Sequence, residues 1–171
     1  MLNRLEAVLR ISQNRQKGFI LFEVALAAIF LISMSTAILL SINSLQRYCY
    51  RNQVRLAAEM LAADIQSLQQ ETMFSSEKFT KTLNVSNNDK LGYRIYTNGI
   101  NSPLHKRIIF ADCGYANVYF SQYLSSISFY KNGSPKTNGT YLLRHKKLEN
   151  FYCKLSLQPV TGRVTVTEYG S

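Results

Sequence analysis

Tryptophan is absent from this chain of 171 residues, and histidine, cysteine and proline are scarce. The residues that could bind a metal through nitrogen or sulfur are Cys49, Cys113, Cys153, His105 and His145. No two of them have the spacing of two to four residues that zinc sites use. The chain also lacks the motifs G-x-x-x-x-G-K-[ST] and H-E-x-x-H, and neither histidine adjoins a recognisable nucleophile motif. We therefore predict no metal site, no cofactor and no enzyme activity, and we expect both histidines to be solvated residues of loops or strands.

Acidic residues are also few, because ten Asp and Glu accompany twenty Lys and Arg, which gives a net charge of +10. A charge of this size attracts nucleic acid, anionic lipid or an acidic partner, and it does not choose among them. Eleven Tyr provide apolar surface to bury, which is typical of an ordered, strand-capable chain. The length predicts one domain with its own core, plus an appendage.

Residues 19–42 form a long apolar run, FILFEVALAAIFLISMSTAILLSI, in which Glu23 is the single charge. About 24 residues of helix, at a rise of 1.5 Å per residue, cross a hydrocarbon core about 30 Å thick. Four basic residues and one acid precede the run, which predicts a cytoplasmic amino terminus. A cleaved secretory signal is the alternative, but the run is about twice as long as a signal core and lacks a small-x-small cleavage site after it.

The helix is expected to continue beyond the apolar run. Neither Gly nor Pro occurs in residues 19–73, so nothing in the sequence forces a break. Three arginines, Arg47, Arg51 and Arg55, follow the run on the outer side, contrary to a simple charge bias, and we expect the basic leader to set the orientation. Apolar residues spaced by three or four predict a stripe that faces a core: Val54, Ala57, Leu61, Ile65 and Leu68.

From about Lys78 the apolar period changes from helical to alternating, which predicts antiparallel β-structure packed on the helix. Strands are expected at 80–85, 91–96, 107–111, 116–121, 125–130, 140–144, 152–157 and 163–167. The turn dipeptides between them are Asn98-Gly99, Asn132-Gly133 and Asn138-Gly139. The predicted fold class is therefore α+β, with a long amino-terminal helix and antiparallel sheets.

Two cysteines of the β-rich part leave their pairing open. Outside the cytoplasm, a disulfide between Cys113 and Cys153 would close a loop of roughly 40 residues and stabilise the domain by about 3 to 4 kcal/mol. Two separate buried thiols are the alternative. Cys49 is expected to be unpaired or available to another subunit.

The residues around the start of the apolar run resemble the processing signal of type IV prepilins: Lys17, Gly18, Phe19 and Glu23, in the pattern K-G-F-x-x-x-E. The resemblance implies that a membrane prepilin peptidase cuts between Gly18 and Phe19, and that the new amino group of Phe19 is methylated. A glycine before the cut admits an extended backbone into a tight protease site. Glu23 would neutralise the amino terminus of a neighbouring subunit, so that two costly buried charges disappear together. The alternative for Glu23 is a helix-end carboxylate that reaches the lipid headgroups.

The carboxy-terminal half is similar to the GspH/FimT group of minor pseudopilins and to the ComGD-like competence pseudopilins. The similar residues are Ile127, Phe129, Asn132, Gly133, Gly139, Thr140, Thr161, Gly162, Arg163 and Val164, with the segment LAADIQSLQQE upstream. The resemblance implies a structural subunit of a type IV pilus, a type II secretion pseudopilus or a competence pseudopilus, at the initiating tip. It also implies a leader at 1–18, a membrane helix at 19–42, its continuation at 43–75 and an extracytoplasmic domain at 76–171, anchored in a bacterial inner membrane. The implied partners are other pilins, the prepilin peptidase, an inner-membrane assembly platform and lipid.

DNA capture in natural transformation is the alternative function. Without residues 1–18, sixteen basic and nine acidic residues remain. The basic residues that could hold phosphates are Arg144, Lys146, Lys147, Lys154 and Arg163. Some FimT proteins resemble DNA receptors with a basic terminal tail, and here Arg163 matches that tail whereas the residues after it do not. A solvated basic turn is the other interpretation.

Overall fold

The structure is a computed structural model, and it describes residues 2–75, 81–85, 90–97 and 103–170, with side chains from residue 21 onward. The helix α1 (Leu2–Phe74) comes first, and eight strands follow it within these residues. The chain divides into two compact units, Met1–Gln46 and Arg47–Ser171.

The predicted unbroken helix is confirmed, and it is longer than expected at its amino end. α1 has 73 residues and begins at Leu2, so it includes most of the segment expected to be a leader. Leu, Arg, Glu and Ala in residues 2–17 favour helix, and Gly18 costs only about 1 kcal/mol, which is too little to end it. In the first unit, every side chain from residue 21 to residue 46 is exposed, although most are apolar. By length and composition, α1 is long and apolar enough to cross a membrane.

The part of α1 in the second unit supplies one wall of the core. All five residues of the predicted stripe are buried: Val54, Ala57, Leu61, Ile65 and Leu68. Ala58 and Ala62 are buried beside them, which widens the stripe with small side chains. Burying this stripe against β-structure stabilises the domain through the apolar area removed from water.

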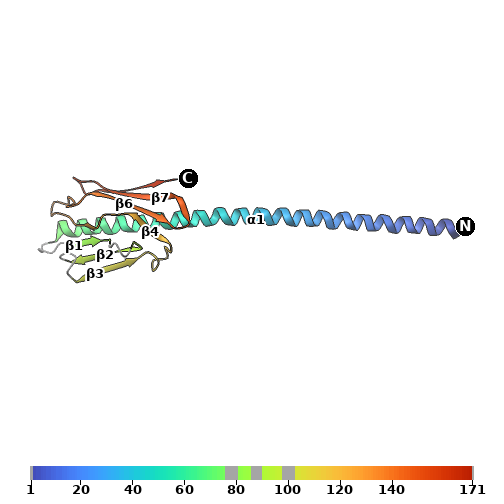
Figure 1. The fold of residues 1–171 in the computed structure, drawn as a ribbon, viewed down its shortest axis with the longest axis horizontal. Helices are drawn as coiled ribbons and strands as arrows, with labels where there is room; N and C mark the ends of the chain where they lie inside the picture. The colour runs from blue at the N-terminus through green and yellow to red at the C-terminus, as the bar shows by residue number, and fades with distance from the viewer. Residues whose placement is uncertain (1, 76–80, 86–89, 98–102, 171) are drawn as a thin grey trace. The chain divides into compact units, whose positions relative to one another are not determined.

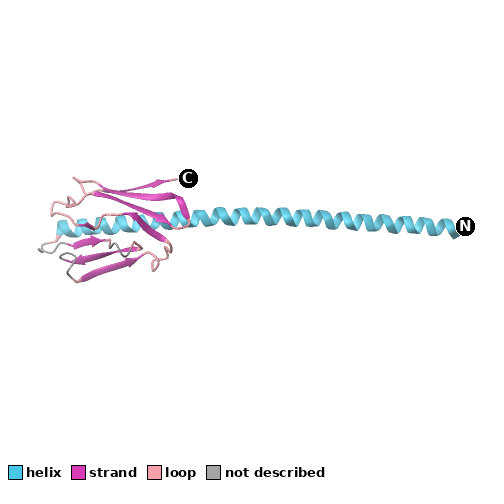
Figure 2. Cartoon of the chain, viewed as in Figure 1, coloured by secondary structure: helices cyan, strands magenta, loops and turns pink. Residues whose placement is uncertain are grey.

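The strands are β1 (Lys81–Asn84), β2 (Gly92–Thr97), β3 (Leu104–Ile109), β4 (Val118–Gln122), β5 (Ser126–Ile127), β6 (Gly139–His145), β7 (Leu148–Leu157) and β8 (Val164–Tyr169). They form two four-stranded antiparallel sheets, in the orders β3-β2-β1-β5 and β4-β6-β7-β8. Figure 1 shows β1 to β3 on one side of the later part of α1 and β6 and β7 on the other, and Figure 2 distinguishes helix from strands in the same view. The predicted α+β fold is confirmed.

All eight predicted strands are present, with bounds that differ by a few residues. The largest difference is at 125–130, where β5 has only two residues and Phe129 pairs with Pro135 in an isolated bridge. Proline has no N–H to continue a ladder, and the chain turns back at Asn132 and Gly133. That turn therefore replaces the end of the predicted strand.

The other turn dipeptides have different outcomes. Asn138-Gly139 forms no separate turn, because β6 begins at Gly139. Asn98-Gly99 lies outside the described residues. The chain also changes sheet twice in succession, since β4 belongs to the second sheet, β5 to the first and β6 to the second.

A chain of aromatic rings joins the two sheets through the core. Tyr93 of β2 meets Phe110, whose ring in turn meets Phe120 of β4, with centroid distances of 6.2 and 5.2 Å. Phe120 contacts Tyr141 of β6 at 5.8 Å. Each such pair contributes about 0.5 to 1.5 kcal/mol beyond its buried area. The rings thus fix one sheet against the other.

One side chain, that of Gln69, ties the end of α1 to two turns. Its Nε2 donates hydrogen bonds to the carbonyl oxygens of Gly133, at 2.7 Å, and Thr161, at 2.9 Å. Both turns contain a glycine in the left-handed region, Gly133 with φ of 82° and Gly162 with φ of 66°. A Cβ at Gly162 would lie 2.5 Å from Gln69 Nε2. The N-G and T-G-R motifs therefore mark the places where two turns meet the helix.

Candidate functional site

The apolar segment of α1 carries one charge. Glu23 is exposed, and it is the only charged residue from residue 21 to residue 46. The predicted processing residues, Gly18 and Phe19, precede it in α1, and their side chains lie outside the described set. A carboxylate at membrane depth costs a few kcal/mol unless a partner neutralises it.

The hydroxyl groups of this segment are satisfied within α1. They donate to carbonyl oxygens about one turn earlier at 2.7 to 2.9 Å: Ser33 to Phe30, Ser35 to Leu31, Thr36 to Ser33 and Ser41 to Ala37. Such bonds remove the cost of placing a hydroxyl in hydrocarbon, where no water is available. Among the polar side chains of residues 21–42, the Glu23 carboxylate is then the one with no partner among the described side chains.

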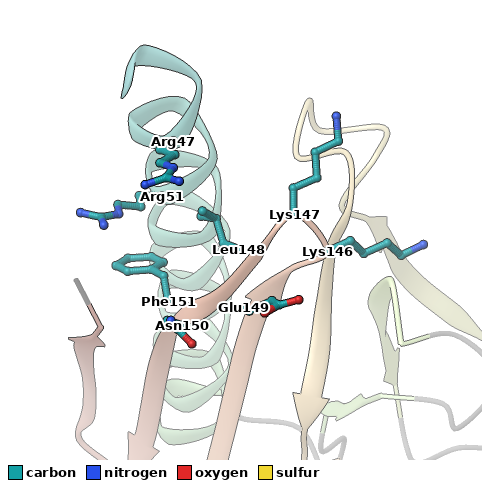
Figure 3. Close-up of a pocket in the computed structure, with 8 residues that line it drawn as sticks. All are labelled: Arg47, Arg51, Lys146, Lys147, Leu148, Glu149, Asn150 and Phe151. Atoms are coloured by element: carbon teal, nitrogen blue, oxygen red, sulfur yellow. The ribbon is translucent and has the colours of Figure 1, made fainter. Parts of the chain in front are cut away.

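A basic pocket of about 380 Å³ opens between α1 and the start of β7 (Figure 3). It is lined by Arg47, Arg51, Lys146, Lys147, Leu148, Glu149, Asn150 and Phe151. Figure 3 shows Arg47 and Arg51 on α1, near Phe151, and shows Lys146 and Lys147 extending outward from the β6–β7 turn. Four basic residues and one acidic residue from two distant segments therefore line one hollow.

His145, at the end of β6, corrects the expectation that both histidines are solvated. Its side chain is buried, and its ring stacks on Tyr50 of α1 with centroids 4.4 Å apart and an angle of 17° between the planes. Its Nδ1 accepts a hydrogen bond from the Lys147 backbone N–H at 3.1 Å, and Lys147 Nζ donates to the Tyr50 hydroxyl at 3.3 Å. This stack holds the β6–β7 turn against α1. His105 is an exposed residue of β3, as predicted.

Burial also changes the acid response of His145. Loss of solvent lowers its pKa from the usual 6.5, and Lys147 lowers it further, whereas a backbone hydrogen bond with Ala116 opposes the change. Below about pH 6.5 the unfolded chain therefore binds more protons than the folded one. We expect the melting temperature of the wild type to decrease between pH 7.5 and pH 5.5, and His145→Phe, which keeps a stacked ring, to reduce that decrease. Melting curves at both pH values test this, and an equal decrease in the variant would contradict it.

The outer face of the second sheet carries a row of aromatic and basic side chains. The strand register places Tyr119, Arg144, Tyr152 and Tyr169 next to one another on four adjacent strands. The Arg144 guanidinium lies 5.2 Å from the centroid of the Tyr152 ring, and that ring stacks on Tyr169 at 5.1 Å and 12°. Arg144 Nε has no hydrogen-bond partner among the described residues. We call these four residues the aromatic row, and planar groups such as bases stack on surfaces of this kind.

The five basic residues predicted to hold phosphates do not form one patch. They are Arg144, Lys146, Lys147, Lys154 and Arg163. The first four lie on β6, β7 and the turn between them. Arg163 immediately precedes β8, at the end of the β7–β8 ladder where Leu157 pairs with Val164. The other end of this ladder, where Tyr152 pairs with Tyr169, is closer to the β6–β7 turn and lies five residues, or about 17 Å, away. The structure therefore separates Arg163 from the turn and brings Arg47 and Arg51 to it instead.

The three cysteines are free thiols, and the disulfide that the sequence allowed is not formed. Cys113 is exposed in the turn after β3, whereas Cys153 is buried in β7. The environments differ, since Cys113 lies near Tyr93 of the first sheet and Cys153 lies near Arg55 on the side of the second sheet. Burial raises the pKa of the Cys153 thiol to about 12, so the group stays protonated and unreactive.

No protein-family model matches the sequence, and no curated protein matches it. Among solved structures, the crystal structure of the type IV minor pilin FimU from Pseudomonas aeruginosa is similar, with a TM-score of 0.51 and 20% sequence identity over 68% of this chain and 90% of that chain. A second crystal form of the same protein gives a TM-score of 0.47 and 15% identity, over 66% and 91% of the two chains. The architecture and the first match show a type IV pilin-like α+β fold.

Proposed function

We propose that the protein is a minor pilin or pseudopilin, a structural subunit that packs its apolar helix beside the helices of other subunits. One observation carries the proposal: in a type IV pilin-like fold, an exposed apolar helix presents a lone carboxylate, Glu23. The assembly would be a type IV pilus, a type II secretion pseudopilus or a competence pseudopilus, and the position would be its initiating tip. The GspH/FimT-like and ComGD-like motifs support this finer assignment.

The domain organisation belongs to the same proposal. Residues 1–18 form the leader that a prepilin peptidase removes, and 19–42 form the single span of a bacterial inner membrane. Residues 43–75 continue the helix, and 76–171 form the domain outside the cytoplasm. The partners are the peptidase, an assembly platform in the membrane, other pilins and lipid.

The charge of Glu23 favours assembly over the isolated subunit in the membrane. Before assembly its carboxylate is exposed in a segment that otherwise has no charge. Beside the amino terminus of a neighbouring processed subunit, the carboxylate and the amine neutralise each other, and the cost of both charges decreases. The helix therefore exchanges a lipid environment that penalises Glu23 for a packed one that satisfies it.

Glu23→Gln should reduce the incorporation of the subunit into the pilus at least tenfold, because the amide keeps the shape of the side chain but cannot neutralise an amine. Immunoblots of sheared pili, normalised to the amount in the membrane, measure this. Ser35→Ala, in the same segment, is the matched control, since it removes a hydroxyl that bonds only within α1. Wild-type incorporation of Glu23→Gln would refute the role of Glu23.

DNA capture is the second candidate function, and the aromatic row favours it because Arg144 and three tyrosines form a partly exposed stacking surface. Full-length protein in non-ionic detergent should then shift duplex or single-stranded DNA in a gel. Tyr152→Ser with Arg144→Gln should weaken the shift at least tenfold, whereas Lys131→Gln with Lys136→Gln, which removes two exposed cations elsewhere, should not. No shift at low salt would eliminate this candidate.

A further inference from the structure

Three cations of the domain have an acidic partner, and the cations of the basic pocket are not among them. Arg55 pairs with Glu59, Lys81 with Glu71 and Lys106 with Asp64. In the described part of the chain, none of the four pocket cations makes an ion pair: Arg47, Arg51, Lys146 and Lys147. With Glu149 as its single acid, the pocket therefore holds an excess of positive charge, which attracts an anion from outside the chain.

Arg51 is placed for such a ligand. Its guanidinium lies 5.5 Å from the centroid of the Phe151 ring, which fixes the charge at the wall of the pocket. Its Nε is buried and has no hydrogen-bond partner among the described residues. Buried donors of this kind are normally satisfied. An anion with several acceptor oxygens, such as a phosphate, would satisfy the fork of an arginine.

The second segment of the pocket is held in place by the stack that His145 forms with Tyr50. The Nζ of Lys147 lies 5.4 Å from the centroid of the Tyr50 ring and 3.3 Å from the Tyr50 hydroxyl oxygen. Lys146 extends from the same turn (Figure 3). The turn is thus fixed beside α1, and its two ammonium groups add to the charge of the two arginines.

The position of Arg47 in the chain indicates where the anion comes from. It follows residue 42, the end of the proposed membrane span, by five residues. Five residues reach at most about 18 Å even when fully extended, so this part of the pocket lies within or next to the headgroup layer. Each Lys or Arg at such a surface strengthens the attraction to anionic lipid about fivefold.

We propose that the basic pocket binds the phosphate of an anionic phospholipid headgroup at the outer surface of the membrane that α1 spans. The inference rests on the proposed membrane anchoring. The proposal gives a ligand to Arg47 and Arg51, which follow the apolar run. Basic residues are usually concentrated on the cytoplasmic side of a membrane span, so few are expected there. The headgroup holds the domain at the bilayer, and the subunit must leave it when it enters a pilus.

Native mass spectrometry of the full-length protein in non-ionic detergent tests the proposal. Phosphatidylglycerol and phosphatidylcholine with the same acyl chains are added separately, so that contacts with the apolar helix contribute equally. The wild type should retain phosphatidylglycerol at least tenfold more than phosphatidylcholine. Equal retention of the two lipids would overturn the proposal.

Two sets of substitutions locate the site. The pocket variant carries Gln in place of Arg47, Arg51, Lys146 and Lys147, and it should lose the preference for phosphatidylglycerol. The control variant carries Gln in place of four exposed cations elsewhere, Lys90, Lys131, Lys136 and Arg163, and it should keep the preference. If the pocket variant unfolds, Lys146→Gln with Lys147→Gln, both on an exposed turn, should still reduce the preference severalfold. An unchanged preference in a folded variant would refute the site.

Competitors distinguish the sources of phosphate. Inorganic phosphate and duplex DNA, each at the phosphate concentration of the lipid, should leave phosphatidylglycerol bound. Displacement by inorganic phosphate would assign the pocket to free anions, and displacement by DNA would assign it to nucleic acid, and either result overturns the lipid proposal. Recovery of the pocket variant in sheared pili separates this inference from the proposed function, because incorporation without lipid preference would leave the function intact.

Discussion

Gly18→Val is expected to leave the proposed leader attached in nearly all molecules, whereas the wild type is expected to lose it. A prepilin peptidase must hold the backbone before the scissile bond in an extended form within a tight site. Glycine allows this because it has no side chain, whereas a β-branched residue adds two methyl groups at the cut. The expected processed fraction decreases from nearly complete to below about a tenth, which corresponds to a loss of transition-state stabilisation of more than about 1.4 kcal/mol.

Intact-mass measurement of the membrane form distinguishes the outcomes. The wild type should begin at Phe19 and carry one additional methyl group, and Gly18→Val should retain residues 1–18. Ala7→Val places the same side chain in the leader at a distance from the cut and should be processed normally. A wild type that keeps its leader in a host with the peptidase would refute the identification, as would normal processing of Gly18→Val.

The sequence predicted the elements of the fold because their signals are local. A stripe such as Val54, Leu61 and Ile65 repeats at the period of a helix, so it marks a buried face whatever packs on it. Alternation at period two marked all eight strands in the same way. The ends of strands were predicted less accurately, as at β5. There, Phe129 pairs with Pro135 in an isolated bridge and the chain turns at Gly133, so the ladder ends where residue propensity alone would continue it.

The sequence could not predict which strands share a sheet. β5 pairs with β1 although β4 and β6 lie in the other sheet, and such pairing depends on contacts between distant residues. The same reason explains His145, whose burial requires Tyr50 from a segment 95 positions earlier. The basic pocket also combines residues of α1 with residues of the β6–β7 turn. In the sequence these two segments are far apart, so one was interpreted as arginines after the predicted membrane span and the other as a solvated basic turn. The only local signal was the excess of arginine from residue 47 onward.

Gly162→Ala is expected to destabilise the domain by about 3 kcal/mol, for two separable reasons. An alanine at φ of 66° pays about 1 to 2 kcal/mol for the left-handed conformation. Its Cβ would also lie 2.5 Å from Gln69 Nε2 and 2.6 Å from the Gly133 carbonyl oxygen, so the amide must move. Moving it breaks the bonds of Gln69 to Gly133 and Thr161, and each such loss costs about 1 kcal/mol.

Gly114→Ala is the matched control for Gly162→Ala. Gly114 has φ of 85°, and nothing lies within 4 Å of a Cβ built there, so alanine should cost only the conformational part. Thermal unfolding of the full-length variants, followed by the near-ultraviolet circular dichroism of the tyrosines, should show a decrease of about 10 °C for Gly162→Ala and about 4 °C for Gly114→Ala. Gln69→Ala should cost less in the Gly162→Ala background than alone, because the same two bonds are already broken. Equal decreases for the two glycine variants, or additive effects of Gln69→Ala, would show that the two turns are not held to α1 through this amide.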